Sequence, residues 1–438
     1  MKKADIIIKA ENILTMSGND DGHIVNGAVA IVGNKIGGVG KAEAILSEYS
    51  SDAVIDHGKS IIMPGLINTH THAAMVYFRG MADDLPLKTW LEEHIWPAEG
   101  KWLGNDFVRD ATELACLEML QAGVTTFLDM YFFGDASAES VKKIGMRAVL
   151  GVGILDFPSV AAQNTDEYFE KAEVFIKRYE DDNIITPCIA PHAPYTCGPD
   201  TYRRAVDISE KYGIPIHTHL SETEWEVNEI ISRYKMRPAE YIDSAGALNR
   251  RMIAAHCVWL DDKEIDLFAE RGASVSHCPE SNMKLASGSA RVAKMIERGV
   301  NVTLGTDGAA SNNDLDVLGE MQTASKLHKL LSGDPTVIDA RRSVMMATAH
   351  AADALGMQDS LGRIKAGFRA DLIVVDINKP HMTPMYDVYS HLVYSAKASD
   401  IQYVMVDGIP VIDNGQPVLV SGEEVIARAN EWAERIRE

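Results

Sequence analysis

At 438 residues the chain exceeds the size at which one hydrophobic core usually stops growing, so one large domain with a smaller companion is expected. Its 63 acidic and 42 basic residues give a net charge of −21, which disfavours nucleic acid or an anionic membrane as a partner. Five irregularly spaced cysteines, no long apolar run and no secretory leader favour a cytoplasmic protein over a disulfide-rich or membrane-spanning one.

The amino-terminal 62 residues have the pattern of a small sheet. Short runs rich in Ile and Val predict strands at residues 5–10, 27–32 and 35–39, separated by turns at 17–22 and 33–34. After His72, residues 73–102 combine glycine and two prolines with many aromatic and Met side chains. We predict that this second stretch is irregular and covers a site.

From residue 106 onward, helical and extended patterns alternate. Residues 106–122 carry apolar side chains at helical spacing, and this helix is expected to end at Gly123. Eight strands are predicted, the first leading into His70 and the others at residues 124–129, 148–154, 184–190, 214–220, 252–256, 273–277 and 300–305. Eight strands separated by helices indicate an α/β fold, the (β/α)8 or TIM barrel, in which parallel strands are buried.

Histidines gather at the carboxyl ends of the predicted strands, where a barrel of this kind forms its active site. Seven of the 14 histidines lie there: His70, His72, His192, His217, His219, His256 and His277. Asp307 follows the eighth strand in the same way. A random scatter would rarely produce this placement, so we expect several of these side chains to be functional.

Four of these residues have the chemistry of a metal site. His70 and His72 are separated by one residue, so on a strand their side chains point to the same face. With His219 and Asp307 they offer three imidazoles and a carboxylate, which suit zinc, iron, manganese or cobalt. On the first pair alone, two polar residues at a strand end are an equally good interpretation.

Two further residues suit proton transfer. Glu222 lies three residues beyond His219 and is placed to reach over a metal as a proton shuttle. His256 ends the sixth strand and would donate a hydrogen bond to the reacting centre. The alternative for His256 is a core histidine that is satisfied by the main chain.

Five motifs occur in a characteristic order along the chain. They are Pro-Gly-Leu-Ile-Asn-Thr-His-Thr-His at 64–72, His-Thr-His-Leu-Ser-Glu at 217–222, His-Cys at 256–257, His-Cys-Pro-Glu-Ser-Asn at 277–282 and Leu-Gly-Thr-Asp-Gly-Ala-Ala-Ser-Asn-Asn at 304–313. Together they resemble the amidohydrolase superfamily, and within it the 5-methylthioadenosine/S-adenosylhomocysteine deaminases and the related triazine hydrolases.

The resemblance implies a domain organisation. It predicts a metal-dependent barrel at residues 63–363 and a small β-sandwich assembled from both chain ends, at 1–62 and 364–420. Short strand patterns at 362–376 and 404–411 agree with a second contribution to that sandwich. A C-terminal helix is expected at 421–438.

The resemblance also implies an activity. It predicts hydrolytic deamination of an adenine nucleoside with one divalent metal per subunit, Zn²⁺ or Fe²⁺. The lack of a lysine after the fourth strand favours a single metal over two. Asp307 would take a proton from the attacking water, His256 would orient that water, and Glu222 would protonate N1 of the purine so that ammonia leaves.

Substrate contacts are implied in the same way. Glu99 would bind the ribose hydroxyls, His192 the purine, and Glu222 and Ser311 the substrate as well. 5-Methylthioadenosine is the expected substrate, with S-adenosylhomocysteine or adenosine as further ones. Arg147 precedes the third strand, whereas many of these deaminases carry an arginine near that strand's end that suits a carboxylate. This departure places S-adenosylhomocysteine in more doubt than methylthioadenosine.

The sequence leaves two alternative functions open. Hydrolysis of a triazine or of guanine is the alternative within the superfamily, and Glu99 argues against it because a free base has no ribose. A barrel that has lost its activity is a second alternative, which the full set of ligands and proton carriers disfavours. Residues Met75, Phe78, Leu85 and Trp90 would suit a thioether tail, although ordinary packing is the better explanation for each one taken singly. A homo-oligomer is also expected.

Overall fold

The computed structural model describes residues 1–18 and 22–438, and its centre is an eight-stranded parallel sheet rolled into a nearly closed barrel. The strands are β8 (Leu66–Thr71), β9 (Val124–Tyr131), β10 (Arg147–Ile154), β11 (Ile185–Pro191), β12 (Ile216–Leu220), β13 (Met252–His256), β14 (Ser274–His277) and β15 (Asn301–Leu304). They are neighbours in chain order, and every pair is parallel. The predicted barrel fold is therefore confirmed, with all eight strands found close to their expected positions.

Side chains close the seam between the first and last barrel strands. Thr69 Oγ1 donates to Leu304 O at 2.8 Å and lies 2.7 Å from Thr303 Oγ1. Just beyond the strands, the amide of Asp307 donates to His70 O at 3.0 Å. This last bond ties the loop after β15 to the end of β8, so residues 237 positions apart in the sequence share one corner of the barrel.

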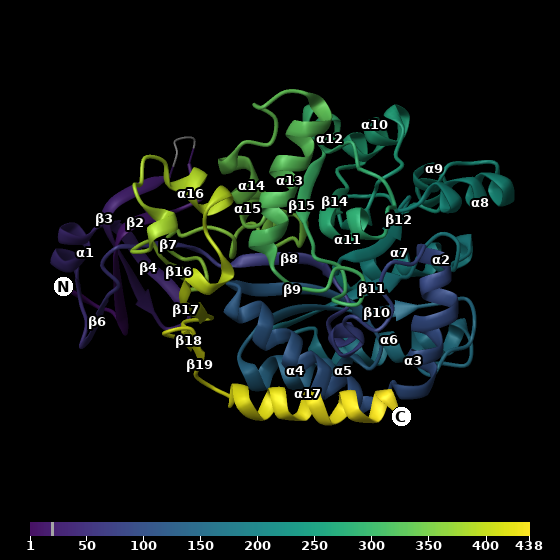
Figure 1. Cartoon of the computed structure of the whole chain (residues 1–438), viewed down its shortest axis with the longest axis horizontal. Helices are drawn as coiled ribbons and strands as arrows, with labels where there is room; N and C mark the ends of the chain where they lie inside the picture. Colours follow the sequence, from purple (N-terminus) through teal and green to yellow (C-terminus); the bar gives the residue numbers. More distant parts are fainter. Residues whose placement is uncertain (19–21) are drawn as a thin grey trace.

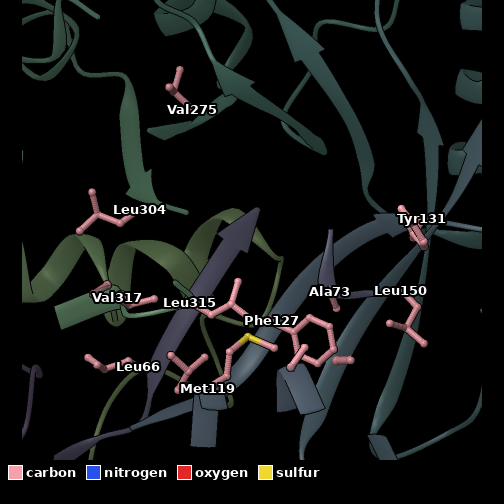
Figure 2. Packing of buried hydrophobic residues seen from close by; sticks show 14 of the residues in the cluster. Leu66, Ala73, Met119, Phe127, Tyr131, Leu150, Val275, Leu304, Leu315 and Val317 are labelled. Carbon is pink, nitrogen blue, oxygen red and sulfur yellow. The ribbon is translucent and has the colours of Figure 1, made fainter. Parts of the chain in front are cut away.

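Helices surround the barrel and follow the strands in turn (Figure 1). They are α4 (Asn105–Gln121), α5 (Gly134–Ile144), α6 (Thr165–Tyr179), α7 (Pro199–Tyr212), α8 (Glu224–Tyr234), α9 (Pro238–Ser244), α10 (Asp262–Arg271), α11 (Pro279–Lys284), α12 (Val292–Glu297), α13 (Val317–Ser332), α14 (Ala340–Met346) and α15 (Ala349–Ala354). Figure 2 shows part of the apolar packing, with Leu66, Met119 and Phe127 among the buried side chains. The predicted helix at 106–122 is α4, and Gly123 follows it with a φ of 82°.

The two chain ends meet in a second sheet of nine strands. From the amino-terminal part come β2 (Ile6–Leu14), β3 (His23–Val32), β4 (Lys35–Lys41), β6 (Ala53–Asp56) and β7 (Ser60–Pro64). From the other end come β16 (Leu372–Asp376), β17 (Ile401–Val406), β18 (Ile409–Asp413) and β19 (Gln416–Pro417). The two halves join where β7 pairs antiparallel with β16, with Met63 opposite Ile373. The expected contribution of both ends is thus confirmed, although the strands form one continuous sheet.

Several local features of these regions differ from the sequence-based expectation. Helix α1 (Ala42–Glu48), and a small pair of strands β1 (Lys2–Lys3) and β5 (Tyr49–Ser50), lie between residues predicted as sheet. The predicted stretch 362–376 becomes a strand only from Leu372. The turn predicted at 17–22 falls partly outside the described residues, which omit 19–21. The proposed division into domains remains a prediction.

The covering segment is largely helical, which corrects the prediction that residues 73–102 are irregular. It contains the short helix η1 (Ala73–Phe78), then α2 (Leu87–Thr89), the wider π-type turn η2 (Trp90–Ile95) and α3 (Trp96–Trp102). Pro97 misled the sequence interpretation, because proline is tolerated in the first turn of a helix and here occupies that position in α3.

A buried ion cluster connects the barrel to the second sheet. Arg147, only 3% exposed, begins β10 and therefore lies at the amino end of the barrel. Its Nε donates to Asp371 Oδ2 at 2.9 Å and its Nη2 to Asp407 Oδ1 at 3.0 Å. Arg147 is committed to this junction at the end of the barrel opposite the strand-end histidines, so it does not contact a substrate there.

The C-terminal helix α17 (Gly422–Arg437) lies along α4 on the outside of the barrel (Figure 1). Arg428 Nη2 donates to Glu113 Oε2 at 2.7 Å, and Trp432 Nε1 donates to Asp110 Oδ2 at 3.0 Å. The Trp432 ring packs edge-on against Phe107, with the ring centres 5.3 Å apart.

The other short elements are η3 (Pro380–Met382), α16 (Val388–Tyr394) and η4 (Ala398–Asp400). Within residues 1–18 and 22–438, no helix has the length and apolar character needed to cross a bilayer.

Candidate metal and active site

Four side chains meet at the carboxyl end of the barrel. His70 and His72 come from the end of β8, His219 from β12, and Asp307 from the loop after β15. The Nε2 atoms of His72 and His219 are 3.1 Å apart, and Asp307 Oδ1 lies 3.4 Å from Nε2 of both His70 and His72. The structure therefore brings together the four residues predicted as metal ligands.

The hydrogen bonds of the imidazoles fit a metal. His72 Nδ1 lies 2.7 Å from Met130 O, and His219 Nδ1 lies 2.9 Å from His192 O. A carbonyl only accepts, so both Nδ1 atoms carry hydrogen, and in the neutral rings both Nε2 atoms present lone pairs. Two lone pairs 3.1 Å apart beside a carboxylate repel each other unless a cation lies between them. The Nε2 atom of His70 is buried without a hydrogen-bond partner, as expected for a ligand atom.

The environment keeps His70 and His219 neutral. Burial lowers the pKa of His70 to about 3 and lowers the pKa of His219 well below its usual value. Neutral imidazole is the form that binds a metal. Three nitrogens and one carboxylate oxygen form a donor set typical of zinc and other divalent transition metals.

Asp307 is held rigidly in an unusual backbone conformation. Its φ is 63°, in the left-handed region that non-glycine residues seldom adopt. Its Oδ2 accepts from Ser281 Oγ at 2.7 Å and from Ser311 Oγ at 2.8 Å, while Oδ1 accepts from the Gly308 amide at 2.7 Å. Ser311 was predicted to contact substrate, but it lies behind Asp307 and is absent from the described cavity lining. Its position suits orientation of the carboxylate.

Glu222 and His256 lie beside this cluster. Glu222 Oε2 is 3.8 Å from His256 Nε2. Asn282 Nδ2 donates to His256 Nδ1 at 3.0 Å, so the proton of the neutral ring is on Nε2, facing Glu222. Burial, with a smaller effect from the charge of Asp307, raises the pKa of Glu222 to about 8. At neutral pH this carboxyl group carries a proton and is suited to general acid catalysis.

Glu226 supports the catalytic loop, and the sequence interpretation missed it. Its two oxygens accept from the Ser221 amide at 2.8 Å and the Glu222 amide at 2.9 Å. Ser221 has a φ of 51°, so this carboxylate stabilises a strained turn. Thr223 caps α8 by accepting from the Glu226 amide, and the Thr-x-x-Glu spacing of a capping box was the available signal.

Replacing Glu226 by Gln is expected to lower both stability and turnover. The substituted amide leaves one of two buried main-chain donors without an acceptor, which costs about 1–3 kcal/mol in the free energy of unfolding. Urea unfolding and steady-state kinetics measure the two effects. Glu264→Gln is a matched control, because buried Glu264 accepts from two main-chain amides in the same way on α10, away from the site. Glu264→Gln should lose stability but keep its turnover. Equal turnover in the two variants would contradict the role assigned to Glu226.

The cluster forms the floor of a cavity of about 330 Å³. Its lining comprises His72, Met75, Leu87, Trp90, Leu91, Trp96, Glu99, Gly100, Met130, Tyr131, Phe132, Gly153, Ile154, Leu155, Phe157, Pro158, Ser159, Val160, His192, Tyr195, His219, Glu222, His256 and Asp307. Phe78 and Leu85, predicted with Met75 and Trp90 for a thioether tail, are not among these described lining residues. The chamber is therefore mostly apolar, with its polar groups gathered at the floor and at Glu99.

Glu99 and His192 both line this cavity. Glu99 Oε1 accepts from Tyr131 Oη at 2.7 Å, and burial raises the pKa of Glu99 to about 7. His192 Nδ1 lies 2.9 Å from Thr196 Oγ1, whose own hydrogen is donated to Ala193 O. His192 Nδ1 is therefore the donor, and its Nε2 is an acceptor.

Comparison with known proteins agrees with this architecture. Residues 61–411 match the model of the amidohydrolase family. A 5-methylthioadenosine/S-adenosylhomocysteine deaminase from Thermodesulfovibrio yellowstonii is 51% identical, over 98% of each chain. A 5'-deoxyadenosine deaminase from Methanosarcina acetivorans is 44% identical, over 99% of this chain and 98% of its own.

A solved structure extends the similarity to the fold. The adenosine deaminase from Xanthomonas campestris with bound zinc is 38% identical and superposes with a TM-score of 0.97, covering 100% of this chain and 99% of its own. The family model spans most of the chain, and the relatives align with it from end to end. The chain therefore belongs to the amidohydrolase family.

Proposed function

We propose that this protein is a metal-dependent hydrolytic deaminase of adenine nucleosides, which converts 5-methylthioadenosine or a related 5′-deoxy nucleoside into its inosine analogue and ammonia. The observation that carries the proposal is the floor of the cavity, where four metal donors lie beside a protonated Glu222 and the Nε2–H of His256. The names of the relatives from Thermodesulfovibrio yellowstonii and Methanosarcina acetivorans support the nucleoside class.

One divalent metal per chain fits the donor set. His70, His72, His219 and Asp307 would hold it, and when bound it would lower the pKa of a coordinated water toward neutrality. Zinc is the metal we favour, because the zinc-containing relative from Xanthomonas campestris has the same fold, and Fe²⁺ suits the same ligands. No lysine directly follows β11, where Pro191 is followed by His192, and this favours one metal over two.

The surrounding residues have distinct tasks in the reaction. Asp307 Oδ1 takes a proton from the attacking water, and His256 Nε2–H donates a hydrogen bond to the oxygen of that water. Glu222 gives its proton to N1 of the purine, which makes C6 more electrophilic. A proton then passes to the amino nitrogen, the C6–N bond breaks, and ammonia leaves as the C6 carbonyl forms.

The lining of the cavity favours an uncharged 5′ substituent. Among the lining residues, all within the described chain, there is no lysine or arginine to pair with a carboxylate. Lys88 and Arg233 line an adjoining cavity of about 650 Å³. Lys88 lies 3.9 Å from Glu92, and Arg233 is paired with Glu229, so both charges are already matched. Methylthioadenosine and 5′-deoxyadenosine should therefore be better substrates than S-adenosylhomocysteine.

A substrate panel tests the function. Purified protein is incubated with 5-methylthioadenosine, 5′-deoxyadenosine, adenosine, S-adenosylhomocysteine, guanine and a triazine, and ammonia release is followed with the change in purine absorbance. Turnover of nucleosides without turnover of the free base or the triazine supports the proposal. Activity confined to guanine or the triazine would replace it with the alternative hydrolase.

Glu99→Gln is expected to weaken use of nucleosides. At pH 8, above its pKa of about 7, Glu99 is ionised and accepts from the ribose hydroxyls. Hydrogen bonds to a charged group are worth about 1.5–3 kcal/mol, so kcat/KM for 5′-deoxyadenosine should fall roughly 10- to 100-fold. Glu92→Gln, on the same covering segment, is the control and should change little. Equal kinetics for the two variants would remove Glu99 from the ribose site.

The cellular setting is a further proposal. All five cysteines, namely Cys116, Cys188, Cys197, Cys257 and Cys278, are buried and unpaired, which supports a reducing cytoplasm as the location. Assembly as a homo-oligomer also stays a prediction, and light scattering coupled to size-exclusion chromatography measures it directly.

A further inference from the structure

The three histidine ligands are oriented by different kinds of partner. His72 and His219 donate from Nδ1 to main-chain carbonyls, those of Met130 and His192. His70 instead has its Nδ1 atom 2.8 Å from Nε2 of another histidine, His217. His217 is fully buried, and it is the first histidine of the His-Thr-His motif whose second histidine is His219.

The hydrogen position on His217 follows from its other nitrogen. His217 Nδ1 lies 2.8 Å from Ile253 O, which only accepts, so Nδ1 carries hydrogen. In the neutral ring, Nε2 of His217 is then an acceptor, and His70 must donate to it from Nδ1. This leaves the buried, unpartnered Nε2 of His70 as a lone pair directed at Asp307 and the other ligands.

We propose that His217 is a positioning residue, which fixes His70 in the tautomer that binds metal. The chain of hydrogen bonds runs from Ile253 O through His217 to His70, and its direction is set by the carbonyl at its far end. The opposite direction would place a hydrogen on His70 Nε2, where the metal has to bind. This inference rests on the proposed metal-dependent function and assigns to this histidine a task that Met130 O and His192 O perform for the other ligands.

Apolar packing alone does not require an imidazole at position 217. A residue that only fills space needs the right volume, whereas the proposed role needs an acceptor aimed at His70 Nδ1. Without an acceptor, His70 loses the partner that holds its ring and its tautomer. Partners of this kind typically change metal affinity by about 10- to 100-fold when they are removed.

Two substitutions separate these roles. His217→Leu keeps an apolar side chain without the acceptor, and His217→Gln restores an acceptor oxygen near the former Nε2. The metal-free proteins are titrated with Zn²⁺ in competition with a chromophoric chelator. We expect His217→Leu to weaken zinc affinity about 10- to 100-fold relative to the unsubstituted protein. His217→Gln should lose much less affinity, because it keeps an acceptor. Equal affinities for the two variants would overturn the proposal.

A control and a direct measurement complete the test. His328→Leu removes a different buried imidazole, which lies 3.0 Å from Nε2 of His277 and holds no proposed ligand, so zinc affinity should not change. Nitrogen-15 NMR of histidine-labelled, unsubstituted protein reads the tautomer directly and does not depend on the folding of a variant. Hydrogen on Nδ1 of His217 supports the proposal, and hydrogen on its Nε2 overturns it. If unsubstituted protein fails to bind Zn²⁺, the proposed function fails instead.

Discussion

Glu222→Gln is expected to reduce turnover of 5-methylthioadenosine by about 10²- to 10⁴-fold, the usual contribution of a general acid. Gln has the same shape but no proton to give to N1 of the purine. Glu222 is not among the four proposed ligands, so zinc content should stay unchanged. Steady-state kinetics with elemental analysis of the same preparations measures both quantities.

The pH profile makes this test more specific. The pKa of Glu222 is raised to about 8, and the protonated form is the active one, so turnover should fall as the pH rises above about 8. The variant should lack this alkaline limb. Glu224→Gln, an exposed neighbour on α8, is the control and should keep both the rate and the limb. Near-normal turnover in Glu222→Gln would remove Glu222 from acid catalysis.

Removal of the metal is expected to reduce activity by several orders of magnitude, because a bound divalent metal is what would lower the pKa of the attacking water toward neutrality. One equivalent of Zn²⁺ per chain should restore it. The metal-free protein should also unfold at a lower temperature, since a ligand that binds only the native state stabilises it. Dialysis against a chelator, metal analysis and thermal unfolding provide the measurements.

Variants of single histidines give this prediction a control. His219→Asn should bind zinc poorly and should not regain activity with one equivalent. His381→Asn changes an exposed histidine that pairs with Asp400 and does not line the cavity, so this variant should behave like the unsubstituted protein. Full turnover by protein without measurable metal would exclude a metal-dependent reaction.

The barrel could be predicted from the chain because its signals are local. Each strand is a short apolar run, and each functional side chain lies at the end of such a run or within a few residues of it, as His219 and His256 do. The rule that parallel strands of a barrel share one active edge then places residues as distant as His70 and Asp307 together. Sequence reasoning of this kind identifies which residues meet without giving their distances.

Other features depend on contacts that cannot be predicted from residue types alone. The tautomers of His72 and His219 are set by main-chain carbonyls, which every residue possesses. The family resemblance implied that Ser311 contacts the substrate, but its hydroxyl points at Asp307. The helices of the covering segment form because Trp90 and Ile95 are buried against the barrel, a tertiary effect that outweighs the local turn signals.

The pairing of β7 with β16 has a consequence for synthesis of the chain on the ribosome. Strand β7 lies between β2 and β16, so the sheet that begins with residue 6 cannot be completed before residues 372–417 have emerged. At about 5–20 residues per second, this delay lasts roughly 20 to 70 seconds. Throughout it the nascent chain exposes an unpaired strand edge, and this is when a chaperone would matter most.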